Sequence, residues 1–182
     1  MELKKYTLDE LLIYEQPTKY IVESTKYDDS YATPVLTAGK SFILGYTNET
    51  EGIFEKDRLP VIIFDDFTTS FHWVDFDFKV KSSAMKFLRP IENNNVNFKY
   101  IYYSMKSLKY SPKDHTRQWI GKYSCLKVPL PPIEIQNEIV AILDELTELT
   151  QELITELKNE IDKRKQQYEY YRDKLLSFKE LK

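Results

Sequence analysis

The chain has 182 residues, of which 42% are hydrophobic and 14% are aromatic. This composition supplies a core for one domain of about 100–150 residues plus an appendage, and it excludes disorder throughout. The lone Cys125 excludes an internal disulfide framework and a cysteine-based metal site. The first residues lack the apolar segment of a secretory signal, and no apolar run approaches about 18 residues, so we expect a cytoplasmic protein with no membrane partner.

The net charge of −3 hides a strong division along the chain. Residues 1–78 hold 7 Lys and Arg against 15 Asp and Glu, whereas residues 79–127 hold 11 against 2. Residues 129–182 hold 8 against 12. The middle block therefore has a net charge of +9, which suits contact with a polyanion such as nucleic acid.

The first half of the chain predicts one short helix and several strands. Thr7–Glu10 has the form of a capping box, so a helix should begin there and end before Pro17. Residues 18–50 predict short strands and turns, and Leu59–Phe64 predicts a buried strand. Phe71–Val80 alternates between apolar and polar residues, which predicts one strand with a packed face.

The next part of the chain combines a helix with a basic loop. Ala84–Ile91 predicts another short strand, and Asn97–Leu108 carries apolar residues at helical spacing. A polar, basic loop over Lys109–Gln118 then leads to Trp119 and to a predicted strand at Tyr123–Val128.

The last third of the chain predicts one long helix. Pro129–Pro132 should stiffen the exit from the domain and exclude a continuing strand, and no Gly or Pro interrupts the chain after them. A helix from Ile133 to Phe178 would be roughly 70 Å long, which the remaining domain cannot cover, so it needs a partner helix in a coiled coil or bundle. The predicted apolar seam comprises Ile139, Ile142, Leu146, Leu149, Leu153, Leu157, Ile161, Tyr168, Tyr171, Leu175 and Phe178. The fold class is therefore α+β, with a mixed α/β domain at residues 1–128 and a long coiled-coil helix at 129–182.

The basic loop contains the side chains that suit nucleic acid. Arg, Lys and Gln pair with guanine and adenine edges, and Lys also contacts phosphates. An exposed polar connector is the alternative interpretation, although the basic block around the loop favours DNA. The candidate DNA contacts are Lys113, His115, Arg117 and Gln118, with Trp119 as the anchor of the loop, and further Lys40, Thr69, Ser70 and His72.

One enzymatic pattern is present in a loose form. Asp66, followed by Asp77 and Lys79, matches the acidic residues and lysine of Mg²⁺-dependent nucleases, in which carboxylates hold the metal near a phosphate. Asp77 and Lys79 also fit the outer face of an alternating strand. The two histidines are too isolated to predict a metal site.

Four stretches of the sequence resemble the specificity subunits of type I restriction–modification enzymes. Pro129–Asp144 fits the family's P-L-P-P-x-x-x-Q-x-x-I segment, which ends a target recognition domain and opens a long helix. Arg172–Phe178 is similar to the close of that conserved region, and Lys5–Leu11 and Thr33–Gly39 are similar to parts of the recognition domains.

The resemblance implies a target recognition domain at residues 1–128 and a conserved helix at 129–182. Family members usually contain two of each, whereas this chain holds one of each, so it looks like a half-subunit, either natural or truncated. A homodimer with antiparallel helices would supply the second copy. Two identical recognition domains should then prefer an interrupted inverted repeat, with centres about 10 bp apart as the simplest geometry.

The resemblance also implies partners. These are double-stranded DNA, modification subunits that methylate adenine, and a restriction subunit. S-adenosylmethionine, Mg²⁺ and ATP are expected on those partner subunits, and this chain is expected to be non-catalytic and without a cofactor. The Lys163–Gln167 stretch is a candidate docking place for modification subunits. The alternatives are the nuclease with Asp66, Asp77 and Lys79, and a coiled-coil adaptor or antirestriction decoy that does not recognise DNA.

Overall fold

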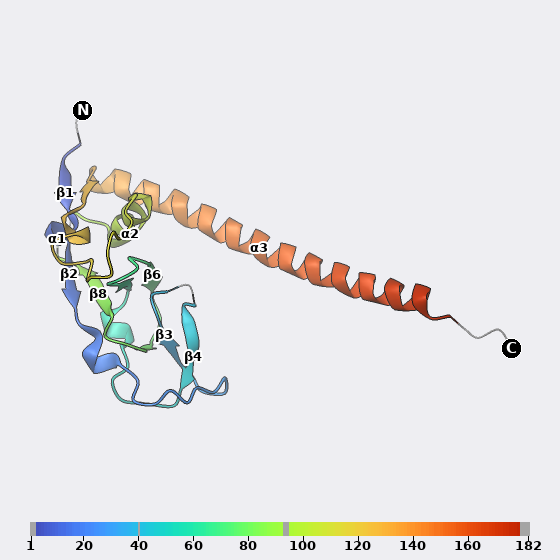
Figure 1. Cartoon of the computed structure of the whole chain (residues 1–182). Coiled ribbons are helices and arrows are strands. Elements are labelled where there is room, and N and C mark those ends of the chain that lie inside the picture. Colours follow the sequence, from blue (N-terminus) through green and yellow to red (C-terminus); the bar gives the residue numbers. More distant parts are fainter. Residues whose placement is uncertain (1–2, 40, 93–94, 179–182) are drawn as a thin grey trace. The chain divides into compact units, whose positions relative to one another are not determined.

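The computed structural model describes residues 3–39, 41–92 and 95–178 (Figure 1). These residues form two compact units, which divide between Asn137 and Glu138. In chain order the elements are β1 (Lys5–Thr7), α1 (Leu8–Leu11), β2 (Leu12–Glu15), η1 (Pro17–Tyr20), β3 (Thr33–Leu36), β4 (Ile43–Thr47), η2 (Lys56–Arg58), β5 (Val61–Asp65), β6 (Phe71–Val74), β7 (Lys79–Val80), β8 (Met85–Pro90), α2 (Phe98–Ser107), η3 (Tyr123–Cys125), β9 (Lys127–Pro129) and α3 (Ile133–Leu176).

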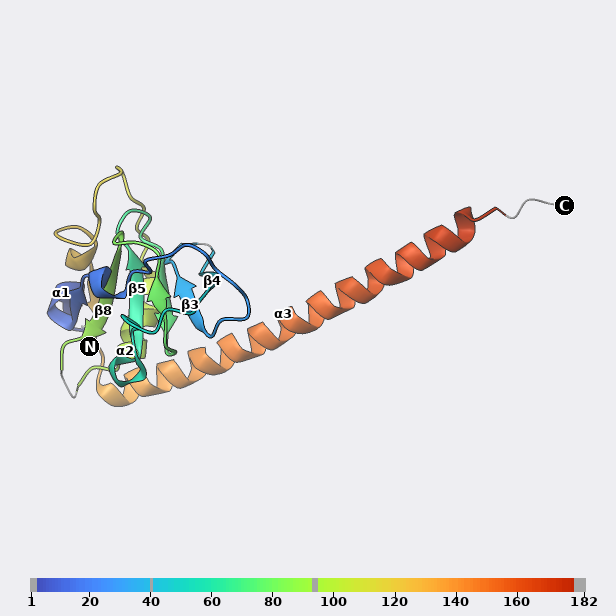
Figure 2. The ribbon, with the colours of Figure 1, turned by 90° about the horizontal axis from the view of Figure 1, so that it is seen from below.

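A four-stranded antiparallel sheet, in the order β2-β8-β5-β6, forms the centre of the first unit (Figure 2). Its inner strands are buried on both faces. Ile62, Phe64 and Leu88 belong to a core cluster that includes side chains of α1, α2 and η3. Alternate residues, among them Ile63 and Phe87, belong to a second cluster that includes side chains of β3 and β7. Since successive strand residues point to opposite faces, β5 carries apolar side chains without interruption.

Two small sheets complete the unit. In one, β1 pairs antiparallel with β9, so strands from near the start and near the end of the first unit lie together. In the other, β3 pairs antiparallel with β4 and parallel with β7.

The prediction of a helix extending to Pro17 was wrong in its length. The capping box is present, since the backbone N–H of Thr7 donates to Oε2 of Glu10 at 2.7 Å. However, α1 ends at Leu11, and the next four residues form β2, which pairs antiparallel with β8. The tertiary pairing outweighs the local helix signal.

The predicted single strand at Phe71–Val80 is two strands in different sheets. β6 pairs with β5 in the central sheet, and β7 pairs with β3 in the small sheet. Between them Phe76 is exposed, although the alternation had placed it on the packed face. An alternating pattern continues unchanged across a bend, so it does not show where one strand ends and the next begins.

The segment before the long helix also differs from its prediction. Tyr123–Cys125 is a 3₁₀ turn, and the strand that follows includes Pro129. Proline is tolerated there because β9 is an edge strand of a two-stranded sheet. The strands predicted at Leu59–Phe64 and Ala84–Ile91 and the helix predicted at Asn97–Leu108 correspond to β5, β8 and α2, with Asn97 as the N-cap of α2.

Gln136 fixes the first turn of α3 to the rest of the first unit. Its side chain is completely buried, and its Nε2 donates to the carbonyl oxygens of Asn95 at 3.0 Å and Pro131 at 2.8 Å. Its Oε1 accepts the backbone N–H of Asn97 at 2.9 Å. Because Asn97 also caps α2, one amide joins the starts of two helices.

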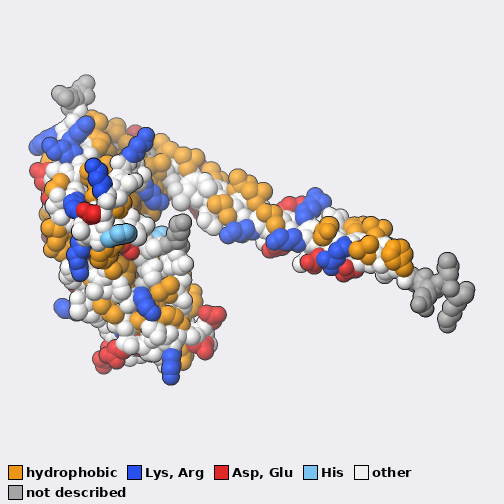
Figure 3. Space-filling model, in the orientation of Figure 1, with side chains coloured by type: hydrophobic (Ala, Val, Ile, Leu, Met, Phe, Trp, Pro, Cys, Tyr) orange, Lys and Arg blue, Asp and Glu red, His pale blue; other side chains and the backbone are white. Residues whose placement is uncertain are grey.

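The long helix α3 begins at Ile133, as predicted, and ends at Leu176. From Ile142 to Leu175 the seam residues are at least half exposed, and hydrophobic side chains are visible along the helix in Figure 3. Phe178, the last predicted seam residue, lies beyond the helix. Thr150 lies on the seam face, four residues after Leu146 and three before Leu153, and its hydroxyl donates to the carbonyl oxygen of Leu146 at 2.6 Å.

No helix within the described residues combines the length and the apolar content that a membrane-spanning helix requires.

Gly52 and Gly121 provide a matched test of this fold. Both have a positive φ, 64° and 70°, but an added Cβ would lie 2.4 Å from the carbonyl oxygen of Lys19 at Gly52 and would meet no atom within 4 Å at Gly121. Gly121→Ala should therefore lower the free energy of unfolding by about 1 kcal/mol, and Gly52→Ala by about 3 kcal/mol or more.

Urea unfolding followed by tryptophan fluorescence measures both effects, because Trp73 and Trp119 lie in the first unit. Equal losses in the two variants would contradict the described packing around Gly52.

Candidate nucleic-acid interface

A cleft of about 370 Å³ lies where the turn after β5 meets the end of α2. The turn and β6 contribute three of the predicted contacts, Thr69, Ser70 and His72. The remaining lining residues are Gly39, Phe71, Met105, Lys106, Leu108, Tyr110 and Tyr123. Of the predicted contacts that the structure describes, only Thr69, Ser70 and His72 line the cleft. The basic loop contributes Tyr110, whereas Lys113, His115 and Arg117 are not among the lining residues.

The turn at this cleft is held in an unusual conformation. Oδ1 of Asp65 accepts the backbone N–H groups of Phe67 and Thr68, both at 2.8 Å. Thr69 has a φ of 60°, which is rare for a β-branched residue. Such a residue is costly for the fold and clusters at functional sites, so it directs attention to this turn.

His72 connects the turn with the β3–β4 hairpin. Its Nε2 lies 3.0 Å from the carbonyl oxygen of Gly39, and its ring stacks on Phe42 with 4.6 Å between centroids. The half-buried ring is therefore held in place before any ligand binds. Lys40, which follows Gly39, lies outside the described residues.

The basic loop divides into exposed and buried residues. Lys113, His115 and Arg117 are exposed, whereas Gln118 and Trp119 are 1% and 2% exposed. Lys113, His115 and Arg117 are thus available to a large ligand such as DNA.

Gln118 is a correction to the predicted set, because its side chain faces inward. Its Nε2 donates to the carbonyl oxygen of Thr116 at 2.6 Å and to Oδ1 of Asp114 at 2.9 Å, and its Oε1 accepts the hydroxyl of Tyr110 at 2.8 Å. These bonds occupy the amide that would otherwise pair with a base. Gln118 supports the loop from within.

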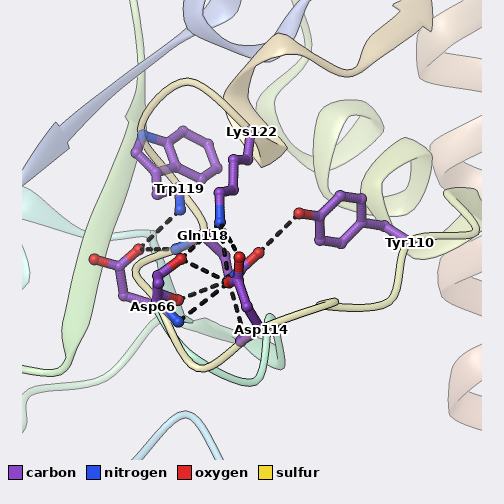
Figure 4. A network of polar contacts seen from close by, with 7 residues as sticks. Asp66, Tyr110, Asp114, Gln118, Trp119 and Lys122 are labelled. Atoms are coloured by element: carbon purple, nitrogen blue, oxygen red, sulfur yellow. Dashed lines mark hydrogen bonds and ion pairs between the residues drawn. The ribbon is translucent and has the colours of Figure 1, made fainter.

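Asp114 holds the outer part of the loop (Figure 4). Its Oδ1 accepts hydrogen bonds from the hydroxyl of Thr116 at 2.6 Å, from Nζ of Lys122 at 3.0 Å and from Gln118. The bond from Thr116, followed by those from Lys122 and Gln118, lowers the pKa of the Asp114 carboxyl well below its usual range. The loop is therefore organised around a carboxylate that stays charged at neutral pH.

Trp119 is buried in the core at the end of the loop. Its ring meets Phe64 of β5 edge-on, with centroids 5.1 Å apart, and stacks on Tyr123 at 6.1 Å. Burial raises the pKa of Tyr123 to about 12, so its hydroxyl remains protonated.

The basic block contributes less charge to the surface than its count suggests. Two of its lysines are internal: Lys79 is 3% exposed and Lys86 is fully buried. Nζ of Lys79 lies 2.7 Å from Oε2 of Glu49, and that of Lys86 lies 3.4 Å from Oδ2 of Asp66. Exposed charge that can meet a polyanion includes the cations of the loop and Lys106 of α2, which lines the cleft.

Two of the three residues of the nuclease pattern, Asp66 and Lys79, serve the fold, whereas Asp77 is exposed. Asp66 is completely buried, and its Oδ1 accepts the backbone N–H groups of Gln118 at 3.1 Å and Trp119 at 2.8 Å. Lys79 donates to the carbonyl oxygen of Glu51 at 2.6 Å in addition to its ion pair. Among the described residues, His, Cys, Asp and Glu form no group of three or more that could hold a metal ion.

Asp114 and Tyr110 were not predicted to have a role in the loop, and Asp66 was predicted to have a different one. The available signal was Asp114 itself, one of only two acidic residues in the basic block. An isolated acid among lysines and arginines often has an internal partner, but the sequence alone does not identify that partner.

Comparison with known proteins identifies the family. The model of the type I restriction modification DNA specificity domain matches residues 2–163. The chain is 53% identical over 189 residues to the Escherichia coli type I restriction enzyme EcoR124I/EcoR124II specificity subunit, across 99% of this chain and 46% of that protein. It is 31% identical over 152 residues to a putative type I restriction enzyme specificity subunit of Haemophilus influenzae, across 78% of this chain and 37% of that protein.

Solved structures share the fold. The S subunit of a type I restriction–modification system from M. genitalium matches with a TM-score of 0.63 at 18% identity, across 95% of this chain and 46% of that chain. A chain from a structure describing assembly of the type I R-M system matches with a TM-score of 0.55 at 16% identity, across 82% and 39%. This chain spans less than half the length of each of these relatives. Since the family model covers most of its residues, the chain belongs to the family of type I restriction modification DNA specificity domains.

Proposed function

We propose that this chain is a sequence-specific DNA-recognition subunit of a type I restriction–modification complex, and that it is non-catalytic. The observation that carries the proposal is the exposed, internally braced basic loop beside the cleft, in a domain of the specificity family. Arg117 and Lys113 supply donors for bases and phosphates, and Thr69 and Ser70 supply hydroxyl groups across the cleft. S-adenosylmethionine, Mg²⁺ and ATP belong to the modification and restriction subunits.

We infer further that two copies pair through α3. The exposed seam is the main support, because apolar side chains repeated over 44 residues are unstable in water without a cover. The charges favour antiparallel helices. Residues 133–156 hold 7 acidic and no basic residues, whereas residues 157–176 hold 6 basic and 4 acidic. An antiparallel pair sets each acidic half against the more basic half of its partner, and a parallel pair sets acid against acid.

The side-chain positions suggest a register for this pair. Glu138, Glu145, Lys163 and Lys174 lie along one edge of the apolar stripe, because they are separated by whole numbers of helical turns. Full overlap of the two helices brings Glu145 near Lys163 of the partner subunit, and Glu138 near Lys174 of the partner subunit. The same register sets Leu153 beside Leu157 of the partner subunit.

The outer face of the paired helices is the proposed docking surface for modification subunits. It includes Gln166, within the polar Lys163–Gln167 stretch, which is exposed. The nuclease alternative has no support in the described residues, since Asp66 and Lys79 are buried in structural contacts.

Removing the loop cations tests the DNA contacts. Lys113→Ala combined with Arg117→Ala should weaken duplex DNA binding and reduce the slope of log affinity against log salt by about 2, since each lost phosphate contact removes about 0.9. Stability should change by less than about 1 kcal/mol, because the Arg117 side chain is 52% exposed beside Asp66. Titrations at several salt concentrations measure the slope.

Lys19→Ala combined with Lys26→Ala is the control, since it removes the same charge from exposed positions in the acidic part of the chain. Equal losses of DNA affinity in both double variants would mean that general electrostatic attraction, and not contact by the loop, explains the effect. No loss in the loop variant would favour the adaptor or decoy alternative.

The symmetry of the pair predicts the form of the DNA site. When the chain is combined with its modification subunits and challenged with random duplexes, the retained sequences should share an inverted repeat interrupted by unspecified bases. Sequencing of the retained pool gives both half-sites and their spacing. A single asymmetric site, or no shared sequence, would contradict recognition by a symmetric dimer.

Charge reversal tests the orientation of the helices. Lys163→Glu with Lys174→Glu should weaken the dimer about tenfold, because four symmetric ion pairs become repulsive, and adding Glu138→Lys with Glu145→Lys should restore it. Sedimentation at low salt measures the dissociation constant of the homodimer.

Lys158→Glu with Lys165→Glu, on the opposite edge of the stripe, is the matched control and should have a smaller effect. A parallel dimer predicts a different result, because it sets this edge of each helix against the opposite edge of its partner, which carries Lys158 and Lys165. In that case the reversal would not weaken the dimer.

A further inference from the structure

Asp66 joins the turn that lines the cleft to the basic loop. It directly follows β5 and begins the turn that carries Thr69 and Ser70. Its backbone N–H donates to the carbonyl oxygen of Ala84 at 2.9 Å, which fixes this point to the segment before β8. Its carbonyl oxygen accepts the backbone N–H of Gln118 at 2.7 Å, which fixes the same point to the basic loop.

The carboxylate of Asp66 strengthens the same connection (Figure 4). Its Oδ1 accepts the backbone N–H groups of Gln118 and Trp119, immediately after Arg117. Its Oδ2 lies 3.4 Å from Nη1 of Arg117, whose side chain is 52% exposed. Thus one buried residue holds the backbone on which an exposed candidate DNA contact stands, and also touches that contact.

A second charge is buried with it. Nζ of Lys86, on β8, lies 3.4 Å from Oδ2 of Asp66, and both side chains are 0% exposed. Within the described part of the chain this ammonium group makes no hydrogen bond. Burying an ion pair costs desolvation that well-packed apolar side chains avoid, so stability alone gives little reason for the pair. Holding the neighbouring segments in a fixed geometry is a better reason for keeping this buried ion pair.

We propose that Asp66, supported by Lys86, is a positioning residue for DNA recognition. It holds the Thr69–Ser70 turn and the Lys113–Arg117 part of the loop at one fixed separation, so that both contact the same duplex in a single register. This inference rests on the proposed function. Base discrimination needs donors placed to within about 0.5 Å, whereas contacts to phosphates tolerate more freedom.

Two double variants separate the effect of the hydrogen bonds accepted by the Asp66 side chain from the effect of the buried charges. Asp66→Asn with Lys86→Met keeps an oxygen that can accept the loop N–H groups, and Asp66→Ala with Lys86→Met removes it. Both lose the same two charges, and methionine conserves most of the volume of the lysine side chain. The comparison between them therefore isolates the hydrogen bonds to Gln118 and Trp119.

The measurement is a ratio of affinities, made with the chain in complex with its modification subunits. The best-bound duplex from a random pool is compared with a scrambled duplex of equal length and composition. The Asn variant should keep the wild-type ratio within about twofold, and the Ala variant should lose about tenfold or more, with binding to the scrambled duplex unchanged within about twofold. Equal ratios in the two folded variants would overturn the inference.

Asp66→Glu decides the matter if the Ala variant does not fold. It keeps the charge and the pairing with Lys86 but moves the carboxylate by one methylene group, so the ratio should fall while the fold is retained. An unchanged ratio would also overturn the inference. A wild-type complex that does not distinguish the selected duplex from the scrambled one would instead refute the proposed function itself.

Discussion

The inner strands of the central sheet are buried on both faces, and the rest of the first unit follows from that constraint. Val61–Phe64 of β5 are completely buried, so the chain must supply a cover on each side. One cover contains α1, α2 and η3, and the other contains β3 and β7. The cleft lies at the edge strand β6, where Gly39 from one cover and Tyr110, which follows α2, come close to the same strand. Loops from both covers can therefore vary at this edge without disturbing the sheet.

A second constraint separates the rigid unit from the exposed helix. The buried amide of Gln136 satisfies backbone groups of Asn95, Asn97 and Pro131, so the first turn of α3 belongs to the first unit. From Ile142 to Leu175 the seam residues of α3 are at least half exposed. The proposed DNA contacts and the proposed pairing helix thus belong to different units of the chain.

Local signals predicted the elements whose stability is mostly local. The helical spacing of apolar residues after Asn97 and the uninterrupted run after Pro132 identified α2 and α3 from sequence. Pairing with β8 converted residues 12–15 into a strand, which no local pattern indicated. The candidate loop was found through its charge, but the direction of its side chains was not. A glutamine among cationic residues can contact a base edge or can support the loop from the inside. Only the hydrogen-bond partners of Gln118 distinguish these two roles.

The seam of α3 contains one polar side chain whose effect on assembly is easily misjudged. Thr150 donates its hydroxyl to the carbonyl oxygen of Leu146, one turn earlier in the same helix. A hydroxyl satisfied in this way carries no unmet demand for water. Another helix can therefore cover this position without offering a polar group of its own, and it needs to present only an apolar surface of complementary shape. Removing water from the middle of the seam therefore costs less free energy than the composition of the seam suggests.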